Sequence, residues 1–308
     1  MRDTMEHRTS ARMALTCAAA LWAVLLQTGV AFAETVDERR TVTANPRVSI
    51  ENVNGTVTVE GWDRKEVHVT GTIGSDVEKV DVDGTEARLH IEVILPRHGR
   101  NLRSEADLLI KVPVKAEVTV EVVNCPIDVS KVDGTLDLES VNGDITVVGK
   151  PARVSARAVN GHIQVTAPCT DTRAETVSGR IVLDGVSGEL VAATVGGSVE
   201  VLGGKFESAE CRSVSGDIDF DGDPEGTGDF EFEAHSGDVI LHVSPDISAE
   251  FDITTFSGDI DSAFGQTPRR KSEYVPGREL SFSLGSGNAR ISISSFSGDV
   301  SVMKKMKK

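Results

Sequence analysis

The sequence predicts an all-β protein built as a parallel β-solenoid (β-helix), with coils of 18–21 residues and a β-rich N-terminal cap. Three observations predict this class. The 308 residues include 29 Gly but only 10 Phe, 2 Trp and 1 Tyr; one short motif returns at a nearly constant spacing; and apolar residues alternate with polar ones on both sides of that motif. Glycines mark tight turns, and alternation with a period of two indicates strands with one buried face.

The first 33 residues have the pattern of a secretory signal peptide. Three arginines precede an apolar run from Met13 to Leu26, and the segment ends in Ala31-Phe32-Ala33. Small residues at the two alanine positions suit a signal peptidase. An uncleaved membrane anchor is the alternative, but the run is interrupted and short for a span of ~20 residues. We therefore expect an exported protein, periplasmic, secreted or associated with the cell envelope, with no transmembrane segment after cleavage.

Composition and cysteine content exclude several classes of protein. Because 48 acidic residues face 32 basic ones, the net charge of −16 gives the chain no general attraction to nucleic acid. A hydrophobic content of 39% is enough to bury a core, which excludes a disordered chain. Cys125, Cys169 and Cys211 follow the signal segment, and this odd number excludes a fold stapled throughout by disulfides. Cys211 is expected to be a small buried residue, and the pairing of the other two is open.

A repeated motif organises most of the chain after the signal segment. Each line of the repeat begins with an apolar or aromatic residue, and in nearly every line a polar residue, Gly, a variable residue and Ile or Val follow. Successive lines are 18, 18, 18, 18, 19, 21, 21 and 40 residues apart. The nine lines begin at Val123, Val141, Val159, Val177, Val195, Val214, His235, Phe256 and Phe296.

This period predicts the domain organisation. We expect residues 121–308 to form the solenoid, because stacking similar lines pairs each strand with its equivalent in the next coil. The 40-residue step holds an insertion near 265–277, rich in Pro and Arg, which is expected to leave the coil as a loop or hairpin. Residues 34–120 are strand-rich but less periodic and predict a β-rich cap or irregular first coils.

Each position of the repeat has an expected role. The glycine is expected to turn the chain with φ > 0, since a residue without Cβ adopts that conformation without penalty. Two strands follow in each line, and their inward columns include Ile145, Ile163 and Ile181 in the first and Val154, Thr172 and Leu190 in the second. The next inward column of the second strand holds alanines where the coils are 18 residues long, and phenylalanines appear in the second-strand core where the coils lengthen to 21, as a wider core requires.

Two of these patterns resemble a known family. The segment Asn54–Asp63 (NGTVTVEGWD) and the recurrent Ser-Gly-Asp-Ile/Val are similar to the bacterial DUF4097 family, whose members carry the provisional label of adhesins. The resemblance covers nearly the whole chain after residue 33. It implies an exported β-strand-repeat protein of the cell envelope, without catalytic residues. Cys125-Pro126 and Gly196 depart from the usual turn residues of the motif.

An acidic stretch is the first candidate site. Between Val214 and Ser262 there are fourteen acidic residues and no Lys or Arg. Carboxylate oxygens around a glycine turn are ligands that Ca²⁺ prefers, although no twelve-residue calcium loop is present. A solvated acidic face is the alternative. The candidate ligands are Asp217, Asp219, Asp221, Asp223, Asp238 and Asp259.

The sequence contains no pattern typical of an enzyme. No G-x-S-x-G elbow occurs, and His235-Ser236-Gly237-Asp238 lies in the repeat turn rather than in a catalytic triad. Arg269, Arg270 and Lys271 in the insertion are the candidate partner contact, because protruding loops carry binding residues. We expect a non-enzymatic, adhesin-like envelope module that binds an envelope protein or a surface polysaccharide and needs no cofactor. The alternative is a cation-dependent β-helix that binds or cleaves polysaccharides.

Overall fold

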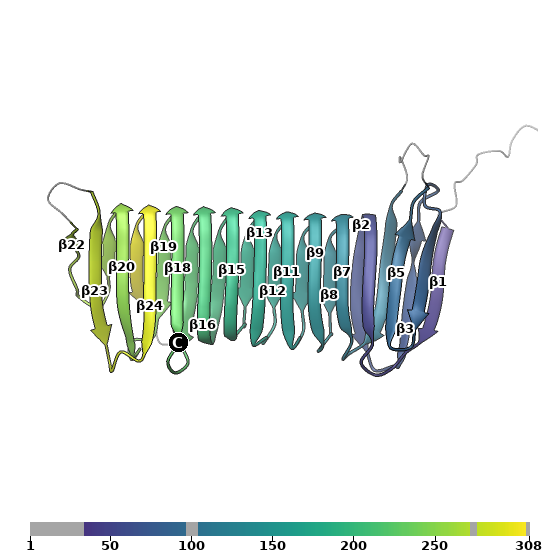
Figure 1. Cartoon of the computed structure of the whole chain (residues 1–308), viewed down its shortest axis with the longest axis horizontal. Coiled ribbons are helices and arrows are strands. Elements are labelled where there is room, and N and C mark those ends of the chain that lie inside the picture. The colour runs from purple at the N-terminus through teal and green to yellow at the C-terminus, as the bar shows by residue number, and fades with distance from the viewer. Residues whose placement is uncertain (1–33, 97–103, 272–275, 306–308) are drawn as a thin grey trace, which may run out of the picture. The chain divides into compact units, whose positions relative to one another are not determined.

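The computed structural model of the protein describes residues 34–96, 104–271 and 276–305. The signal peptide expected at residues 1–33 lies outside the described residues. All regular structure in the described part is β, arranged as a long row of parallel strands (Figure 1). The prediction of an all-β parallel solenoid is confirmed.

Each regular coil contributes one long and one short strand, and these form two parallel sheets. The long-strand sheet contains β7 (Glu117–Asn124), β9 (Thr135–Asn142), β11 (Arg153–Asn160), β13 (Asp171–Ser178) and β15 (Gly188–Gly196). The short-strand sheet contains β8 (Ile127–Ser130), β10 (Ile145–Val148), β12 (Ile163–Thr166) and β14 (Ile181–Asp184). Two longer strands, β2 (Arg47–Trp62) and β16 (Val199–Ser215), take part in both sheets.

The core lies between the two sheets and consists of the predicted columns. In the short-strand sheet Ile145 pairs with Ile163 and Ile163 with Ile181, and all three are fully buried. In the long-strand sheet Val154 pairs with Thr172, and Thr172 with Leu190. Stacking these columns removes apolar surface from water, which is the main force that holds the coils together. The register inferred from the repeat is thus confirmed.

The wider coils are filled by aromatic rings, as the sequence predicts. These coils contain β17 (Ile218–Pro224), β18 (Asp229–Ser236), β19 (Val239–Val243), β20 (Ala249–Ser257), β21 (Ile260–Ser262), β24 (Ala289–Ser297) and β25 (Val300–Lys304). The rings of Phe206 and Phe220 have centroids 5.2 Å apart, and those of Phe220 and Phe232 lie 4.9 Å apart. All three are buried, so the rings occupy the volume that the longer turns enclose.

Most of the turn glycines serve close approach of the backbone, and the expected positive φ is found in the motif only at Gly55 (117°) and Gly216 (150°) among the described residues. Gly161 and Gly179 are not among the glycines with positive φ, so the expected left-handed turn is wrong at these positions. A Cβ on Gly161 would lie 2.2 Å from the carbonyl oxygen of Gly143, and one on Gly179 would lie 2.0 Å from that of Gly161. Successive turns therefore stack so closely that only a residue without a side chain fits.

The last coil of the sequence is not the last coil of the stack. β24 pairs with β18 on one side and with β20 on the other, and β25 likewise lies between β19 and β21. The order of the repeat in the sequence suggests that Asp259 lies in the coil next to Asp238. In the structure Asp299 lies between them. The C-terminal coil is inserted one position inside the end, and Figure 1 shows β24 between β18 and β20.

The N-terminal end has a similar arrangement. The first coil, β2, lies between β7 and β8 on one side and β5 (Arg88–Ile94) and β6 (Ala106–Pro113) on the other. Antiparallel strands close both ends of the stack and cover the edges of the parallel sheets. They are β1 (Glu34–Thr41), β3 (Glu66–Ile73) and β4 (Lys79–Thr85) at one end, and β22 (Arg269–Arg270) and β23 (Arg278–Leu284) at the other.

Candidate docking surface

The first residue of each repeat line is exposed, and together these residues form what we call the apolar stripe. It runs along the long-strand sheet, where each strand ends before its turn. Exposed fractions rise from 36% at Val53 to 49% at Val195 and Phe296. In the order of the stack the stripe contains Val53, Val123, Val141, Val159, Val177, Val195, Val214, His235, Phe296 and Phe256.

Strand alternation turns the stripe outward. In β11, Ala156 and Ala158 point into the core, so Val159 points to solvent. The buried position just before the stripe carries a hydroxyl group in several coils. Thr176 Oγ1 donates a hydrogen bond to the carbonyl oxygen of Gly161 at 3.1 Å, and Thr194 does the same to Gly179 at 3.3 Å. These bonds join the end of each strand to a neighbouring turn and hold the stripe in place.

The C-terminal end of the apolar stripe is aromatic. The rings of His235 and Phe296 have centroids 4.9 Å apart with planes 5° from parallel, and Phe296 and Phe256 have the same separation and angle. Both faces of the central ring, Phe296, are therefore covered by its neighbours, and the edges are left exposed. Because a sugar platform requires an open ring face, Phe296 cannot serve as one and presents its edges to apolar contacts.

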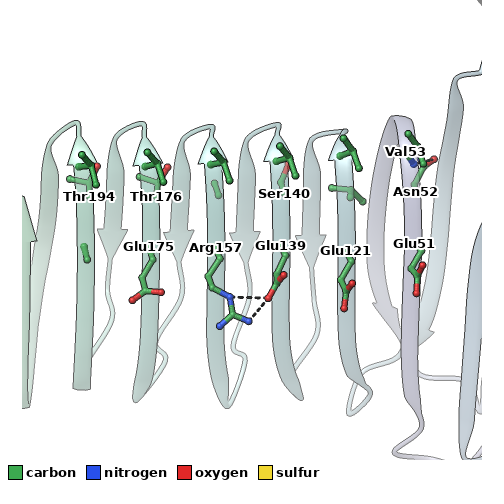
Figure 2. A pocket seen from close by; sticks show the side chains of 18 of the residues that line it. Glu51, Asn52, Val53, Glu121, Glu139, Ser140, Arg157, Glu175, Thr176 and Thr194 are labelled. Atoms are coloured by element: carbon green, nitrogen blue, oxygen red, sulfur yellow. Dashed lines mark hydrogen bonds and ion pairs between the residues drawn. The ribbon is translucent and has the colours of Figure 1, made fainter. Parts of the chain in front are cut away.

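A row of charged residues runs beside the apolar stripe, two residues earlier in each strand. From Glu51 and Val53 to Arg212 and Val214, the row and the stripe line a groove of about 820 Å³ on the long-strand sheet. Figure 2 shows the row from Glu51 to Glu175, with Arg157 bonded to Glu139; Arg157 Nε lies 2.9 Å from Glu139 Oε1. The row contains Glu51, Glu121, Glu139, Arg157, Glu175, Ala193, Arg212 and Glu233.

Acidic residues predominate at the N-terminal end of this row. Glu92 pairs in register with Glu51, Glu51 with Glu121, and Glu121 with Glu139. Adjacent strands are about 4.8 Å apart, and unit charges at that distance repel by about 1 kcal/mol in water. His90 Nε2 lies 3.8 Å from carboxylate oxygens of Glu51 and Glu92. Among the described residues, no basic group forms an ion pair with Glu121.

On the other side of the apolar stripe, the turns carry an amide ladder. Asn124 Nδ2 donates to Asn54 Oδ1 at 2.8 Å, and Asn142 Nδ2 donates to Asn124 Oδ1 at 2.8 Å. Asn160 Nδ2 extends the ladder by donating to Asn142 Oδ1 at 2.9 Å. These amides bind one another and carry no charge. The charged side chains that line the groove therefore lie on the other side of the stripe, in the row that begins with Glu51.

Four aspartates of the repeat turns, Asp217, Asp238, Asp299 and Asp259, form a column along the stack, and three of their carboxylates bind a backbone group of the next coil. Asp217 Oδ1 accepts the backbone N–H of Asp238 at 2.9 Å, and Asp238 Oδ1 accepts that of Asp299 at 2.8 Å. Asp299 accepts the N–H of Asp259, again at 2.8 Å. A negative acceptor strengthens such bonds, and this offsets the repulsion between neighbouring carboxylates. The column therefore has a structural role in joining the coils.

The other predicted acidic ligands lie next to basic residues. Asp219 Oδ1 is 3.5 Å from His242 Nε2, and Asp259 is 2.5 Å from Arg278. Lys305 Nζ lies 2.7 Å from Asp221 Oδ1 and 2.9 Å from Asp223 Oδ2. In the part of the chain that the structure describes, no three His, Cys, Asp or Glu residues form a group that holds a metal ion. Calcium binding by these six aspartates stays a prediction.

The predicted contact residues of the insertion lie at the C-terminal end of the stack. Arg269 and Arg270 form β22 and pair with Glu279 and Arg278 of β23, with both side chains exposed. Lys271 lines a second groove, at the aromatic end of the stripe, together with Phe256 and Phe296. The structure thus brings one of the three residues to the stripe, and sequence reasoning missed the stripe itself.

The three cysteines within the described residues, Cys125, Cys169 and Cys211, are buried and free. Burial raises the pKa of the Cys211 thiol to about 12, and it raises that of Cys125 to about 12 as well. Neither pairs with Cys169, so the pairing that the sequence leaves open does not occur. Cys211 is a small buried residue, as expected.

The stacked coils, the glycine column and the exposed stripe define a parallel β-solenoid with an extended exposed apolar stripe on one face. A model of the Toastrack DUF4097 family matches residues 45–303, and the chain belongs to this family. The resemblance seen in the turn motifs is confirmed. No curated protein matches the chain. Among the described residues, no helix is long and apolar enough to cross a membrane.

Several solved structures are similar to the chain. A protein from Parabacteroides distasonis, provisionally named as lipid binding, is 12% identical with a TM-score of 0.49, over 88% of this chain and 97% of that chain. A provisionally named adhesin from Bacteroides fragilis is 10% identical with a TM-score of 0.36, over 89% and 99%. Another from Parabacteroides distasonis is 9% identical with a TM-score of 0.39, over 89% and 98%.

Proposed function

We propose that the protein is an exported, non-enzymatic binding or structural module of the cell envelope, with the apolar stripe as its contact surface. The observation that carries this proposal is the stripe itself. Ten apolar or aromatic side chains, one per coil, are exposed in an unbroken line. A contiguous exposed apolar patch bordered by polar groups marks an interaction site, and repeat stacks bind partners through such extended faces.

Other features support binding rather than chemistry. The aspartates of the turn column accept backbone hydrogen bonds, and Arg157 and Arg212 bind neighbouring carboxylates. These groups have structural partners and are not aimed at a common point, whereas a catalytic site needs groups that converge on one reacting atom. The provisional adhesin name of structural neighbours agrees with a binding role at the cell surface.

Co-purification from envelope fractions tests the proposal. Tagged mature protein is cross-linked in envelope preparations and compared with Val141→Asp, which places a charge in the middle of the stripe. Val148→Asp is the matched control, because Val148 is 50% exposed but lies on the short-strand sheet. We expect specific partners to be lost with Val141→Asp and kept with Val148→Asp. Shortening of a surface polysaccharide that depends on acids within 217–259 would overturn the proposal in favour of the cleaving β-helix.

A further inference from the structure

The N-terminal half of the apolar stripe has a distinct partner chemistry. We infer that a basic amphipathic helix of a partner protein docks on this half, and this inference rests on the proposed function. The docking surface consists of the stripe from Val53 to Val177, in stack order, and the glutamates beside it. Three properties of this half carry the inference: the spacing of its valines, the charge of the adjacent row, and the side of the stripe on which that charge lies.

The spacing of the valines matches a helix better than a strand. Neighbouring coils are about 4.8 Å apart, so the five valines from Val53 to Val177 span about 19 Å. The apolar face of a helix repeats about every 5.4 Å, and the mismatch over this span is only about 2.4 Å. Side chains on one face of an extended strand repeat about every 6.7 Å, and their mismatch of about 8 Å exceeds one whole coil. About 13 helical residues therefore cover the five valines.

The charge of the row selects a basic partner. Glu92, Glu51 and Glu121 are neighbours in register, with exposed fractions of 46% and 47% for the side chains of Glu92 and Glu51. Their mutual repulsion is relieved when a Lys or Arg lies between them. Arg157 does not counter this field, because its guanidinium already binds Glu139 and Asp137.

The position of the row sets how the helix lies. Each glutamate precedes its valine by two residues, so the two rows are about 6.7 Å apart. A helix whose apolar face covers the valines places the residues flanking that face above the glutamates, and long Lys or Arg side chains reach them while their stems stay on apolar surface. The amides of Asn124 and Asn142 on the opposite side bind within their own ladder. The basic residues of the partner thus belong on the strand side.

A synthetic helix provides the test. A fluorescein-labelled peptide of about 18 residues carries Leu at i, i+3, i+4 and i+7 with Lys on both flanks, long enough to exceed the five valines. Two further peptides are compared: one of the same composition with Leu at every second residue, and one with Glu in place of Lys. Binding to the full mature protein is measured by fluorescence anisotropy at low and high salt.

We expect the helical Lys peptide to bind best and to weaken with salt. Val141→Asp and Glu121→Lys are each expected to weaken its binding by about tenfold or more, since one removes apolar contact and the other reverses the local charge. Val148→Asp and Asp128→Lys are the controls. Both substitutions make the same changes in charge as the test variants, but at residues of the short-strand sheet. We expect both control variants to bind the peptide as well as the unmodified protein does.

Several outcomes overturn the inference. They are absence of binding by the helical peptide, equal binding of the period-two or Glu peptide, and equal loss in the control variants. Sedimentation with phosphatidylcholine vesicles that depends on Val141 would assign the stripe to lipid. If envelope partners are lost with Val141→Asp but the peptide fails, the proposed function stands and the helix is wrong. If every envelope partner survives Val141→Asp, the proposed function itself fails.

Discussion

At the scale of single residues, the carboxylate of Asp238 joins two coils that are far apart in sequence. Its Oδ1 accepts the N–H of Asp299, and its own N–H is bound by Asp217. We expect Asp238→Ala to lose about 1 kcal/mol of unfolding free energy, because a hydrogen-bond acceptor is removed. Asp238→Asn keeps an acceptor and removes one of several neighbouring charges, so its stability is expected to equal or exceed that of the unmodified protein. Urea denaturation measures both.

The same pair of variants separates the structural role from calcium binding. If the column binds Ca²⁺, the ion raises the melting temperature of the unmodified protein and fails to do so for Asp238→Asn. If the carboxylate only binds backbone, Ca²⁺ changes neither protein. A loss of stability in Asp238→Asn as large as that in Asp238→Ala would contradict the acceptor role.

Cys125 and Cys211 make a second prediction at this scale. Because burial raises both pKa values to about 12, the folded thiols stay protonated at pH 8. We expect neither to react with a thiol reagent at pH 8 until the protein is unfolded. Above pH 9.0, the ordinary pKa of the thiol, the unfolded thiols ionise and the folded ones do not, so stability is expected to fall between pH 9 and about 12. Rapid labelling of the folded protein at these residues is the contrary result.

At the scale of elements, Lys305 links the inserted coil to the neighbouring coil through ion pairs with Asp221 and Asp223. Burial raises the pKa of Asp223, but hydrogen bonds from Lys305 and Ser244 outweigh it, and the pKa lies below its ordinary value. A lowered pKa stabilises the fold above about pH 4, and this stability is lost as the pH falls through the folded value. We expect Lys305→Ala to lower stability by about 1 kcal/mol at pH 7, with the difference disappearing in acid.

Thermal unfolding from pH 7 to pH 2 measures this effect. Lys304→Ala is the control, since Lys304 lies over the ring of Phe264 at 4.8 Å and makes no bond to Asp223 among the described residues. A difference between Lys305→Ala and the unmodified protein that stays constant down to pH 2 would show that the contact acts through packing alone.

The order of the elements shows where sequence reasoning stops. Period and alternation predict which residues pair, because each inward column has one chemistry along the whole stack. They do not predict the order of the last coils. The turns at Ser236, Ser257 and Ser297 all read Ser-Gly-Asp, so any of these coils stacks equally well on any other. The insertion of β24 between β18 and β20 pairs strands that are far apart in sequence, and short-range patterns carry no such information.

The stripe, by contrast, was within reach of the sequence. Strict alternation from Ala156 through Ala158 places Val159 on the outer face, and the same count holds in each coil. An apolar residue repeated on an outward position is a signal for a contact surface. The turn motif conceals it, because a residue beside Asn-Gly is naturally assigned to the turn. Two of the charges that give the stripe its acidic half, Glu92 and Glu51, come from β5 and β2, outside the regular repeat, and only the structure places them beside Glu121.

At the scale of the whole molecule, the regular coils act as interchangeable units. Each contacts its neighbours through the same columns, so stability is close to a sum over coils and their interfaces. We expect deletion of residues 161–178, one complete coil, to give a folded protein with a cooperative thermal transition. The deletion joins Asn160 to Gly179, which restores the turn motif and lets β11 pair with β15 in the original register. The stack is expected to shorten by about 4.8 Å, which small-angle scattering measures.

Deletion of half a coil is the matched control. Removing residues 161–169 joins β11 almost directly to β13, so β13 and every later strand take the place of a strand of the other sheet. The turn glycines of the later coils then no longer lie over Gly143, and we expect this variant to aggregate or to lack a cooperative transition. Folding of both deletions with equal stability would contradict the column register, while failure of both would show that β13 is needed for reasons beyond stacking.

Because β13 also carries Val177 and Glu175, the folded full-coil deletion shortens the apolar stripe by one step without altering Val53, Val123 or Val141. Envelope partners that depend on Val141 are therefore expected to remain bound to it.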